Sequence, residues 1–243
     1  MFDIHSHILP AVDDGAADLI ESLHILELMK SQGITDCIAT PHFYPQEDNL
    51  EDFLQATKGA YEHLKILANE RKLPNIYLGC EMLYYEGIGT SVSLPELCLN
   101  GSSFLLLELT DYCINDALFE DLRLIKSNLF ITPIIAHIER YCEAKNYRKL
   151  LKFLKTENIP AQINASSVLI PKLKKVIKKL FASDIAFVIA TDSHSVSERP
   201  PQMAKALEFI EKNFGKSYKD KLCHNADTLY KKIVTENTDA QKQ

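Results

Sequence analysis

The chain begins with "MFDIHSHILPAVDDG", in which two histidines, His5 and His7, precede two adjacent aspartates, Asp13 and Asp14. Histidines and carboxylates also follow later apolar runs, as in "TPHF", "GCEM" and "ATDSH". Imidazole nitrogens and carboxylate oxygens are ligands for divalent transition metals. The sequence therefore indicates a candidate metal centre built from segments that lie far apart in the chain.

The elements that would have to position these donors alternate regularly. Strands are predicted in the segments "FDIHSH", "TDCIATPH", "IYLGCEM", "FLLLEL", "FITPIIAH", "IPAQINAS" and "AFVIATDSH". Helices are predicted over residues 17–32, 50–72, 115–127, 144–157, 171–183 and 200–214. Apolar strands in βα alternation indicate a parallel sheet covered on its faces, which at 243 residues closes most naturally into a distorted (β/α)7, TIM-barrel-like barrel. We expect a single domain over residues 1–234 and a disordered tail over 235–243.

The donors lie where the predicted strands end. In a parallel barrel those carboxyl ends meet on one face. In "HSH" and "DSH" the two donors are two residues apart, so the strand period directs both side chains to the same side. One donor comes from the Asp13–Asp14 pair, and the others are His5, His7, His42, Glu81, Glu108, His137, Asp192 and His194.

Such a cluster requires neutralisation, because a buried carboxylate without a partner is strongly unfavourable. Nine donors are too many for one ion, so we expect two or three ions bridged by a shared carboxylate. The nitrogen and oxygen donors suit Mn²⁺, Fe²⁺ or Zn²⁺ rather than a closed structural zinc site. The three remaining histidines, His24, His63 and His224, are assigned no metal role.

Composition excludes several other classes of protein. A net charge of −6 argues against a nucleic-acid binder. The longest apolar stretch, "LFITPIIAHI", is too short to span a bilayer, and the opening residues do not resemble a signal peptide, so we expect a cytoplasmic protein without membrane insertion. Six cysteines without C-x-x-C spacing indicate neither a disulfide framework nor a zinc knuckle. The oligomeric state is not indicated.

The motifs "DIHSHILPAVDDG", "TPHF", "IIAHIERY", "QINASS" and "ATDSHSVSERPP" resemble those of the PHP (polymerase and histidinol phosphatase) superfamily. More narrowly, the chain is similar to the manganese-dependent protein-tyrosine phosphatases of bacterial capsule and exopolysaccharide operons, the CpsB/CapC family. The resemblance covers residue 1 to about residue 230. Two loops depart from the family pattern, at Ser195 and after His42, where relatives often have Asn and Gly respectively.

The resemblance implies a barrel of PHP type that holds three metal ions, with Mn²⁺ as the expected metal. One ion would be held by His5, His7, Glu81 and Asp192. Glu81 would bridge to a second ion held by Glu108 and His137. The third ion would be held by Asp14, His42 and His194, with Asp14 favoured over Asp13 by the family pattern alone.

Two arginines follow metal-bearing strands, Arg140 in "HIER" and Arg199 in "SERPP". A guanidinium group binds phosphate oxygens in bidentate fashion. The alternative is a surface ion pair with Glu139 or Glu198, but the position at the metal face and the family pattern favour phosphate binding. Aromatic residues that could wall the mouth, although each is individually better explained by packing, are Phe43, Tyr44, Tyr84, Tyr85, Tyr112 and Tyr141.

The expected reaction is hydrolysis of a phosphomonoester by a metal-bridging hydroxide. The resemblance implies phosphotyrosine as the substrate, on the tyrosine-rich tail of a cognate autokinase that controls polysaccharide synthesis. Three alternatives stay open: a small-molecule phosphatase such as histidinol-phosphate phosphatase, an amidohydrolase, and a catalytically silent metal-binding regulatory module.

Two other features have simpler interpretations. Cys142 and Arg148 show the C-x5-R spacing of cysteine-dependent tyrosine phosphatases, but "EAKNY" between them lacks the glycine-rich phosphate loop that this chemistry needs. The basic segment "PKLKKVIKKL" is typical of a solvated helix face, although it could dock an acidic partner.

Overall fold

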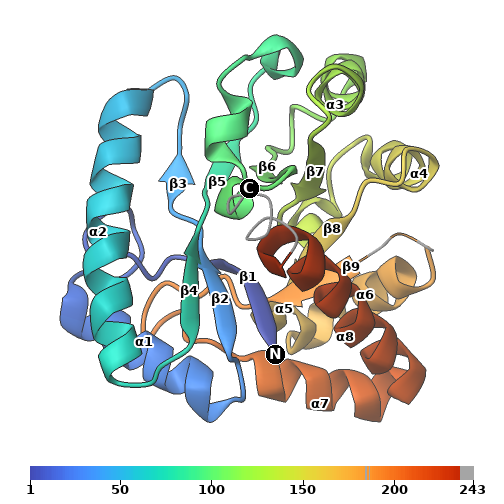
Figure 1. Ribbon diagram of the computed structural model, residues 1–243. Helices are drawn as coiled ribbons and strands as arrows, with labels where there is room; N and C mark the ends of the chain where they lie inside the picture. Colours follow the sequence, from blue (N-terminus) through green and yellow to red (C-terminus); the bar gives the residue numbers. More distant parts are fainter. Residues whose placement is uncertain (184, 186, 236–243) are drawn as a thin grey trace.

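The computed structural model describes residues 1–183, 185 and 187–235 (Figure 1). The expected tail falls largely on residues 236–243, which lie outside the described part. The strands are β1 (Phe2–Ser6), β2 (Asp36–Ala39), β3 (His42–Phe43), β4 (Asn75–Leu78), β5 (Glu81–Leu83), β6 (Phe104–Glu108), β7 (Thr132–Ile135), β8 (Ala161–Asn164) and β9 (Phe187–Ala190). All their pairings are parallel, in the orders β1-β2-β4 and β3-β5-β6-β7-β8-β9.

Two of the predicted strands are broken in the middle. Pro41, which has no N–H to donate, separates β2 from β3, and Gly79 and Cys80 separate β4 from β5. Hydrogen bonds continue across both breaks, from Gly79 N to Ala39 O (2.9 Å) and from Glu81 N to Pro41 O (3.0 Å). The three-stranded and six-stranded sheets are therefore parts of one curved surface. If β2 and β3 are counted as one broken strand, and β4 and β5 as another, this surface has the seven strand paths that the sequence predicts.

The first and last strand paths also meet. Asp192 N donates to His5 O (2.9 Å), and His7 N donates to Ser193 O (2.8 Å). This seam, formed by residues 5–7 and 192–193, completes the ring of backbone contacts. The prediction of a distorted (β/α) barrel is thus confirmed.

Helices surround the strands (Figure 1): α1 (Leu19–Ser31), α2 (Leu50–Glu70), α3 (Asp116–Asn128), α4 (Tyr147–Thr156), α5 (Ala165–Val168), α6 (Lys174–Phe181), α7 (Met203–Phe214) and α8 (Lys216–Tyr230). Short 3₁₀ turns are η1 (Ile88–Thr90), η2 (Leu94–Leu97), η3 (Leu99–Gly101), η4 (Ile138–Tyr141) and η5 (Pro171–Leu173), and η6 (Lys231–Thr235) is a π turn. The side chains of Asp18, Asn49 and Asn115 cap α1, α2 and α3 by accepting a backbone N–H, which fixes where these helices begin.

Helix α8 is the main element that the sequence analysis did not predict. Its Leu229, together with Ile233 and Val234 of η6, packs against Phe2 and Ile4 of β1 in an apolar cluster inside the ring. Asn225 Nδ2 also donates to Phe187 O of β9 (2.8 Å). Helix α8 and η6 therefore cover the end of the barrel where the strands begin, which leaves the opposite end for chemistry.

Candidate metal centre

The nine predicted donors meet at the carboxyl end of the barrel. Three groups of side chains there bring ligand atoms within 4.8 Å of one another. These groups are His5, His7, Glu81 and Asp192; His42, Glu81 and Glu108; and His7, Asp14, His42 and His194. The three histidines without an assigned role lie elsewhere, on α1, α2 and α8.

The first group is fully buried. His5 Nε2 lies 3.1 Å from His7 Nε2 and 3.0 Å from Glu81 Oε2. His7 Nε2 is 3.2 Å from the same Glu81 oxygen, and Asp192 Oδ1 lies 3.5 Å from His5 Nε2. Two nitrogens and two carboxylate oxygens thus face one point.

Hydrogen bonds on the far side of each ring orient these imidazoles. His7 Nδ1 lies 2.6 Å from Asp13 Oδ2, an acceptor. His5 Nδ1 lies 3.2 Å from Gln162 Oε1, which also accepts the His137 N–H (2.7 Å) and so must be the oxygen. With Nδ1 donating, each neutral ring presents the lone pair of Nε2 to the shared point. The shared point is thus lined by four acceptor atoms and by no donor, an arrangement that suits a cation.

Charge around His7 is reflected in the pKa values. Burial alone would lower the pKa of His7, but its hydrogen bonds to Asp13 and Glu81 raise it to about 10. Burial would raise the pKa of Asp13, yet the bond with His7 lowers it to about 2. Glu81 likewise has its pKa lowered by His5 and His137 against the effect of burial. The pocket therefore favours positive charge.

Glu81 joins the first group to the second. Its Oε2 faces His5 and His7, whereas its Oε1 lies 2.8 Å from His137 Nε2. Glu108 Oε1 is 3.3 Å from the same nitrogen, and His42 Nδ1 is 3.3 Å from Glu81 Oε2. The second group can thus draw its nitrogen from His137, as the family resemblance implies, or from His42, which the resemblance assigns to the third ion. In either case Glu81 has the geometry of a bridging carboxylate.

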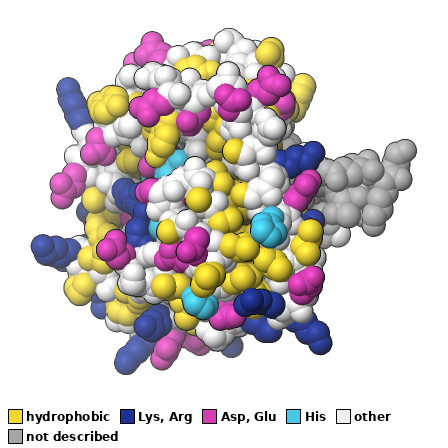
Figure 2. Space-filling view, turned by 90° about the vertical axis from the view of Figure 1, so that its left-hand side faces the viewer, with side chains coloured by type: hydrophobic (Ala, Val, Ile, Leu, Met, Phe, Trp, Pro, Cys, Tyr) yellow, Lys and Arg dark blue, Asp and Glu magenta, His cyan; other side chains and the backbone are white. Residues whose placement is uncertain are grey.

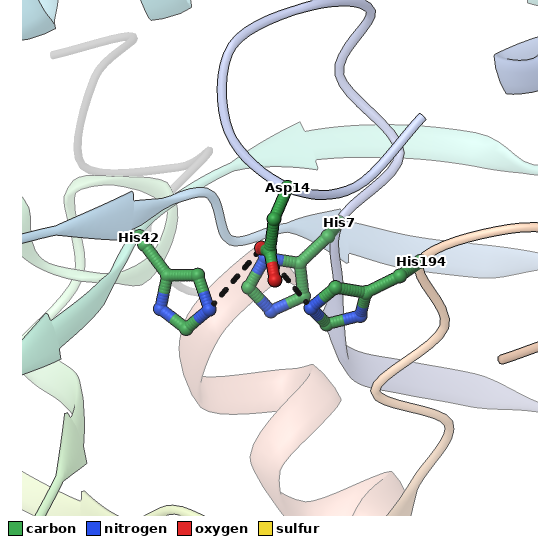
Figure 3. A group of neighbouring side chains, drawn as sticks. All are labelled: His7, Asp14, His42 and His194. Carbon is green, nitrogen blue, oxygen red and sulfur yellow. Dashed lines mark ion pairs between the residues drawn. The ribbon is translucent and has the colours of Figure 1, made fainter. Parts of the chain in front are cut away.

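The third group is shown in Figure 3, where Asp14 lies between His42 and His194. Asp14 Oδ1 is 3.6 Å from His42 Nε2 and 3.4 Å from His194 Nε2. His194 Nδ1 lies 3.1 Å from the Asp192 carbonyl, so its Nε2 is directed into the group. His194 Nε2 and His42 Nδ1 are buried without a hydrogen-bond partner. Because buried polar atoms are rarely left unpaired, His194 Nε2 supports metal binding in this group, whereas His42 Nδ1, which lies 3.3 Å from Glu81 Oε2, supports metal binding in the second group.

The structure separates the roles of the two adjacent aspartates. Asp13 is engaged on three sides, by His7 Nδ1, by the His42 N–H (3.0 Å) and by the Gly15 N–H (3.0 Å). The side chain of Asp14 is 65% exposed and opens the third group to solvent. Glycine is required at position 15, since a Cβ there would lie 2.2 Å from His7 O. Gly15 thereby lets the loop fold closely over His7.

Two of the donors have left-handed backbone conformations, His137 with φ of 29° and Asp192 with φ of 49°. Such residues persist only where their surroundings fix them. Gln162 holds the His137 N–H, and its Nε2 donates to Asn164 Oδ1 (2.7 Å). Asn164 Nδ2 in turn donates to Asp192 Oδ2 (2.6 Å). This amide pair, Gln162 and Asn164, connects both strained donors through one chain of hydrogen bonds.

The amide pair was not assigned a role from the sequence, although "QINAS" was part of the family resemblance. A signal was present, because two polar residues two positions apart interrupt an otherwise apolar strand and must point to the same side. The sequence offers Asp13 only as an alternative ligand to Asp14. Tyr141, considered as a wall of the mouth, is buried, and its hydroxyl lies 3.1 Å from His137 Nδ1 and accepts the Leu109 N–H.

Arg140 and Arg199 converge on one carboxylate oxygen. The NH2 group of each lies 2.7 Å from Asp192 Oδ2, on the side away from the histidines. The guanidinium side chains are 43% and 39% exposed, so both are partly open to solvent. Ser195, one of the departures from the family pattern, accepts the backbone N–H of Arg199 (3.0 Å) and shapes this loop. The ion pairs with Glu139 or Glu198 that the sequence left open are not the contacts these arginines make.

Cys142 does not have the environment of a nucleophile. It follows η4 rather than opening a helix, and Arg148 lies within α4. Burial and the neighbouring Glu143 raise the pKa of the Cys142 thiol, whereas thiolate catalysis needs a lowered pKa. The interpretation of the C-x5-R spacing as coincidence agrees with this geometry.

Chemically, the arrangement offers positions for several cations with two guanidinium groups beside them. Cations so placed polarise phosphoryl oxygens and lower the pKa of bound water, and guanidinium groups stabilise charge on those oxygens. No helix among the described residues is both long enough and apolar enough to cross a membrane.

Residues 1–231 match the family model described as "Capsular polysaccharide synthesis, CpsB/CapC". The chain is 30% identical over 253 aligned positions to tyrosine-protein phosphatase CpsB of Streptococcus agalactiae, covering 95% of this chain and 98% of that one. It is 32% identical to tyrosine-protein phosphatase YwqE of Bacillus subtilis, covering 94% and 91%. A solved structure from work on YwqE and on CpsB of Streptococcus pneumoniae, described as metal-dependent tyrosine phosphatases, superposes with a TM-score of 0.83 at 27% identity, covering 96% of this chain and 94% of that one.

Proposed function

Because the chain belongs to the CpsB/CapC family of capsular polysaccharide synthesis proteins, we propose that it is a metal-dependent tyrosine-protein phosphatase. The observation that carries this proposal is the buried cluster of imidazoles and carboxylates at the barrel end, with two arginines beside it. The relatives named as tyrosine-protein phosphatases match over nearly their whole length. We also propose that residues 1–234 act as one domain.

The metal ligands are proposed in three sets. His5, His7, Glu81 and Asp192 would hold the first cation, and Glu81 would also contribute to a second cation held with Glu108 and His137. Asp14, His42 and His194 would hold the third. The donor set favours Mn²⁺, with Fe²⁺ or Zn²⁺ as alternatives. When bound, the cations supply Lewis acidity and an activated water.

The side chains of this protein perform the remaining tasks. Arg140 and Arg199 bind the phosphoryl oxygens and stabilise the charge that they gain in the transition state. Their shared contact with Asp192 aligns both guanidinium groups before substrate arrives. Asp13, Gln162 and Asn164 fix the ring orientation of His5 and His7 and the position of Asp192.

The physiological substrate that we propose is a phosphotyrosine protein, the tyrosine-rich tail of a bacterial autokinase that acts in polysaccharide synthesis. Support comes from the family and from the exposed, solvent-facing arginines, which a protein segment can reach.

The test compares a phosphotyrosine peptide, a phosphoserine peptide and histidinol phosphate as substrates of the metal-loaded protein. We expect the highest kcat/KM with the phosphotyrosine peptide. A clear preference for histidinol phosphate would replace the proposal with a small-molecule phosphatase, and absence of turnover on all three at full metal occupancy would favour a regulatory metal-binding protein.

A further inference from the structure

A hollow of about 240 Å³ lies beside the metal centre. Four tyrosines and two glutamates are prominent in its lining: Tyr44, Tyr84, Tyr85, Tyr112, Glu47 and Glu86. We call it the tyrosine hollow. Its walls come from the segments that follow β3, β5 and β6, the same strands that position His42, Glu81 and Glu108.

Two contacts join the tyrosine hollow to the metal centre. The ring of Tyr44 stacks on the imidazole of His42, with centroids 5.2 Å apart and planes inclined by 19°. The backbone N–H of Tyr84 donates to Glu108 O (2.9 Å). A tyrosine side chain whose phosphate lies at the metals would therefore place its neighbouring residues within reach of the hollow.

Part of the lining is fixed, and part is open to solvent. Tyr84 is buried and donates its hydroxyl to Asp121 Oδ2 (2.8 Å), while the Tyr44 N–H donates to Asp48 Oδ2 (2.6 Å). Tyr112 is 86% exposed at the rim. A rigid base with an exposed aromatic rim is suited to receiving a side chain from outside.

The charge of the hollow is negative. Glu47 and Glu86 are exposed, and no Lys, Arg or His lines the hollow among the described residues. On the face of the molecule over α2, several Asp and Glu side chains lie in the upper part, where few Lys and Arg side chains are seen (Figure 2). Aromatic faces and carboxylates together attract a cation.

We propose that the tyrosine hollow binds a lysine or arginine side chain that flanks the phosphotyrosine of the substrate. This inference rests on the proposed function and adds a sequence preference to it. An acidic residue at the same place would meet Glu47 and Glu86 and be disfavoured, so the preference distinguishes phosphotyrosine sites by their surroundings.

The experiment measures kcat and KM for a series of phosphotyrosine peptides. Each peptide carries a single Lys at one position before or after the phosphotyrosine and is otherwise neutral. Peptides with Ala or Glu at the same position are the references. At one or more positions we expect Lys to raise kcat/KM about tenfold over Ala, mainly through KM, and Glu to lower it. In the double variant Glu47→Gln/Glu86→Gln the Lys and Ala peptides should become equivalent, with turnover of the Ala peptide unchanged. Tyr112→Ala should reduce the preference in part.

The matched control is Glu62→Gln/Glu208→Gln, which removes two exposed carboxylates from α2 and α7. This control should keep the Lys preference, because the attraction is local. Equal kcat/KM for Lys and Ala peptides at every position would overturn this inference but not the proposed function. The same would follow if the control variant lost the Lys preference as fully as Glu47→Gln/Glu86→Gln does. Failure to hydrolyse any phosphotyrosine peptide would overturn the proposed function and this inference with it.

Discussion

Gln162 offers a direct test of how the metal ligands are held. Its side chain is fully buried, and its Oε1 accepts the His137 N–H (2.7 Å) and faces His5 Nδ1 (3.2 Å). Gln162→Leu keeps the approximate volume but leaves both of these donors without an acceptor. A buried donor without a partner costs about 1–3 kcal/mol, so the free energy of unfolding should fall by about 2–6 kcal/mol.

Metal affinity should fall as well. His5 would lose the contact that fixes its ring, and His137 would lose the one that holds its backbone at a φ of 29°. Loss of such supporting contacts typically lowers metal affinity about 10- to 100-fold. Titration of Mn²⁺ into chelator-stripped protein by calorimetry measures this, and circular dichroism checks that the variant is folded.

Two further variants separate positioning from general instability. Gln162→Glu keeps an acceptor for both donors but loses the N–H that binds Asn164 Oδ1, and should bind Mn²⁺ more tightly than Gln162→Leu. Gln32→Leu removes a side chain that bridges the end of α1 to Pro201 O and to the Ala204 N–H, neither of which belongs to a proposed metal ligand, and should lower stability without changing Mn²⁺ affinity. The reasoning is wrong if folded Gln162→Leu binds Mn²⁺ normally, or if Gln32→Leu weakens binding equally.

Four more outcomes follow from the same site. Exhaustive chelation should abolish phosphatase activity and Mn²⁺ should restore it; activity in protein shown by elemental analysis to be metal-free would contradict the metal mechanism. Arg140→Ala or Arg199→Ala should lower kcat/KM about 100-fold, about 3 kcal/mol of transition-state stabilisation, and a loss under fivefold in steady-state assays would argue against phosphate contact. Cys142→Ser should keep nearly full activity, because the raised pKa of this thiol disfavours the thiolate, and a trapped phosphocysteine would refute this. Mn²⁺ affinity should rise with pH up to about pH 9, because His7 and His137 must lose a proton to bind metal. Burial lowers the pKa values of these two histidines, but hydrogen bonds to carboxylates outweigh it and raise them to about 10 and about 9. A flat affinity profile below about pH 9 would exclude this competition.

The sequence was sufficient to predict where the donors gather. Their positions follow from two rules. The carboxyl ends of parallel strands lie on one face of a barrel, and side chains at i and i+2 in a strand point to the same side. The placement of His5, His7 and Asp192 could therefore be predicted without knowledge of tertiary contacts. The three groups observed contain all the predicted ligands but His137, which contacts Glu81 and Glu108 directly.

Other features depend on contacts between distant segments and could not be predicted. Asp13 and Asp14 are the same residue type at adjacent positions, and only the close fold over Gly15 directs one to His7 and the other to the third group. The left-handed backbone of His137 depends on Gln162 in another strand. Helix α8 buries only Leu222 and Leu229 among its residues, so its apolar pattern is too sparse to be recognised as amphipathic.

The seam between residues 5–7 and 192–193 has a consequence for how the protein folds. Its hydrogen bonds join segments separated by most of the chain, and such contacts are slow to form because they close a long loop of chain. The same residues carry His5, His7 and Asp192, so the first metal position exists only after the ring has closed. Metal uptake during refolding should therefore coincide with the last cooperative step, and protection of the Asp192 and His7 amides from hydrogen exchange should report the same event.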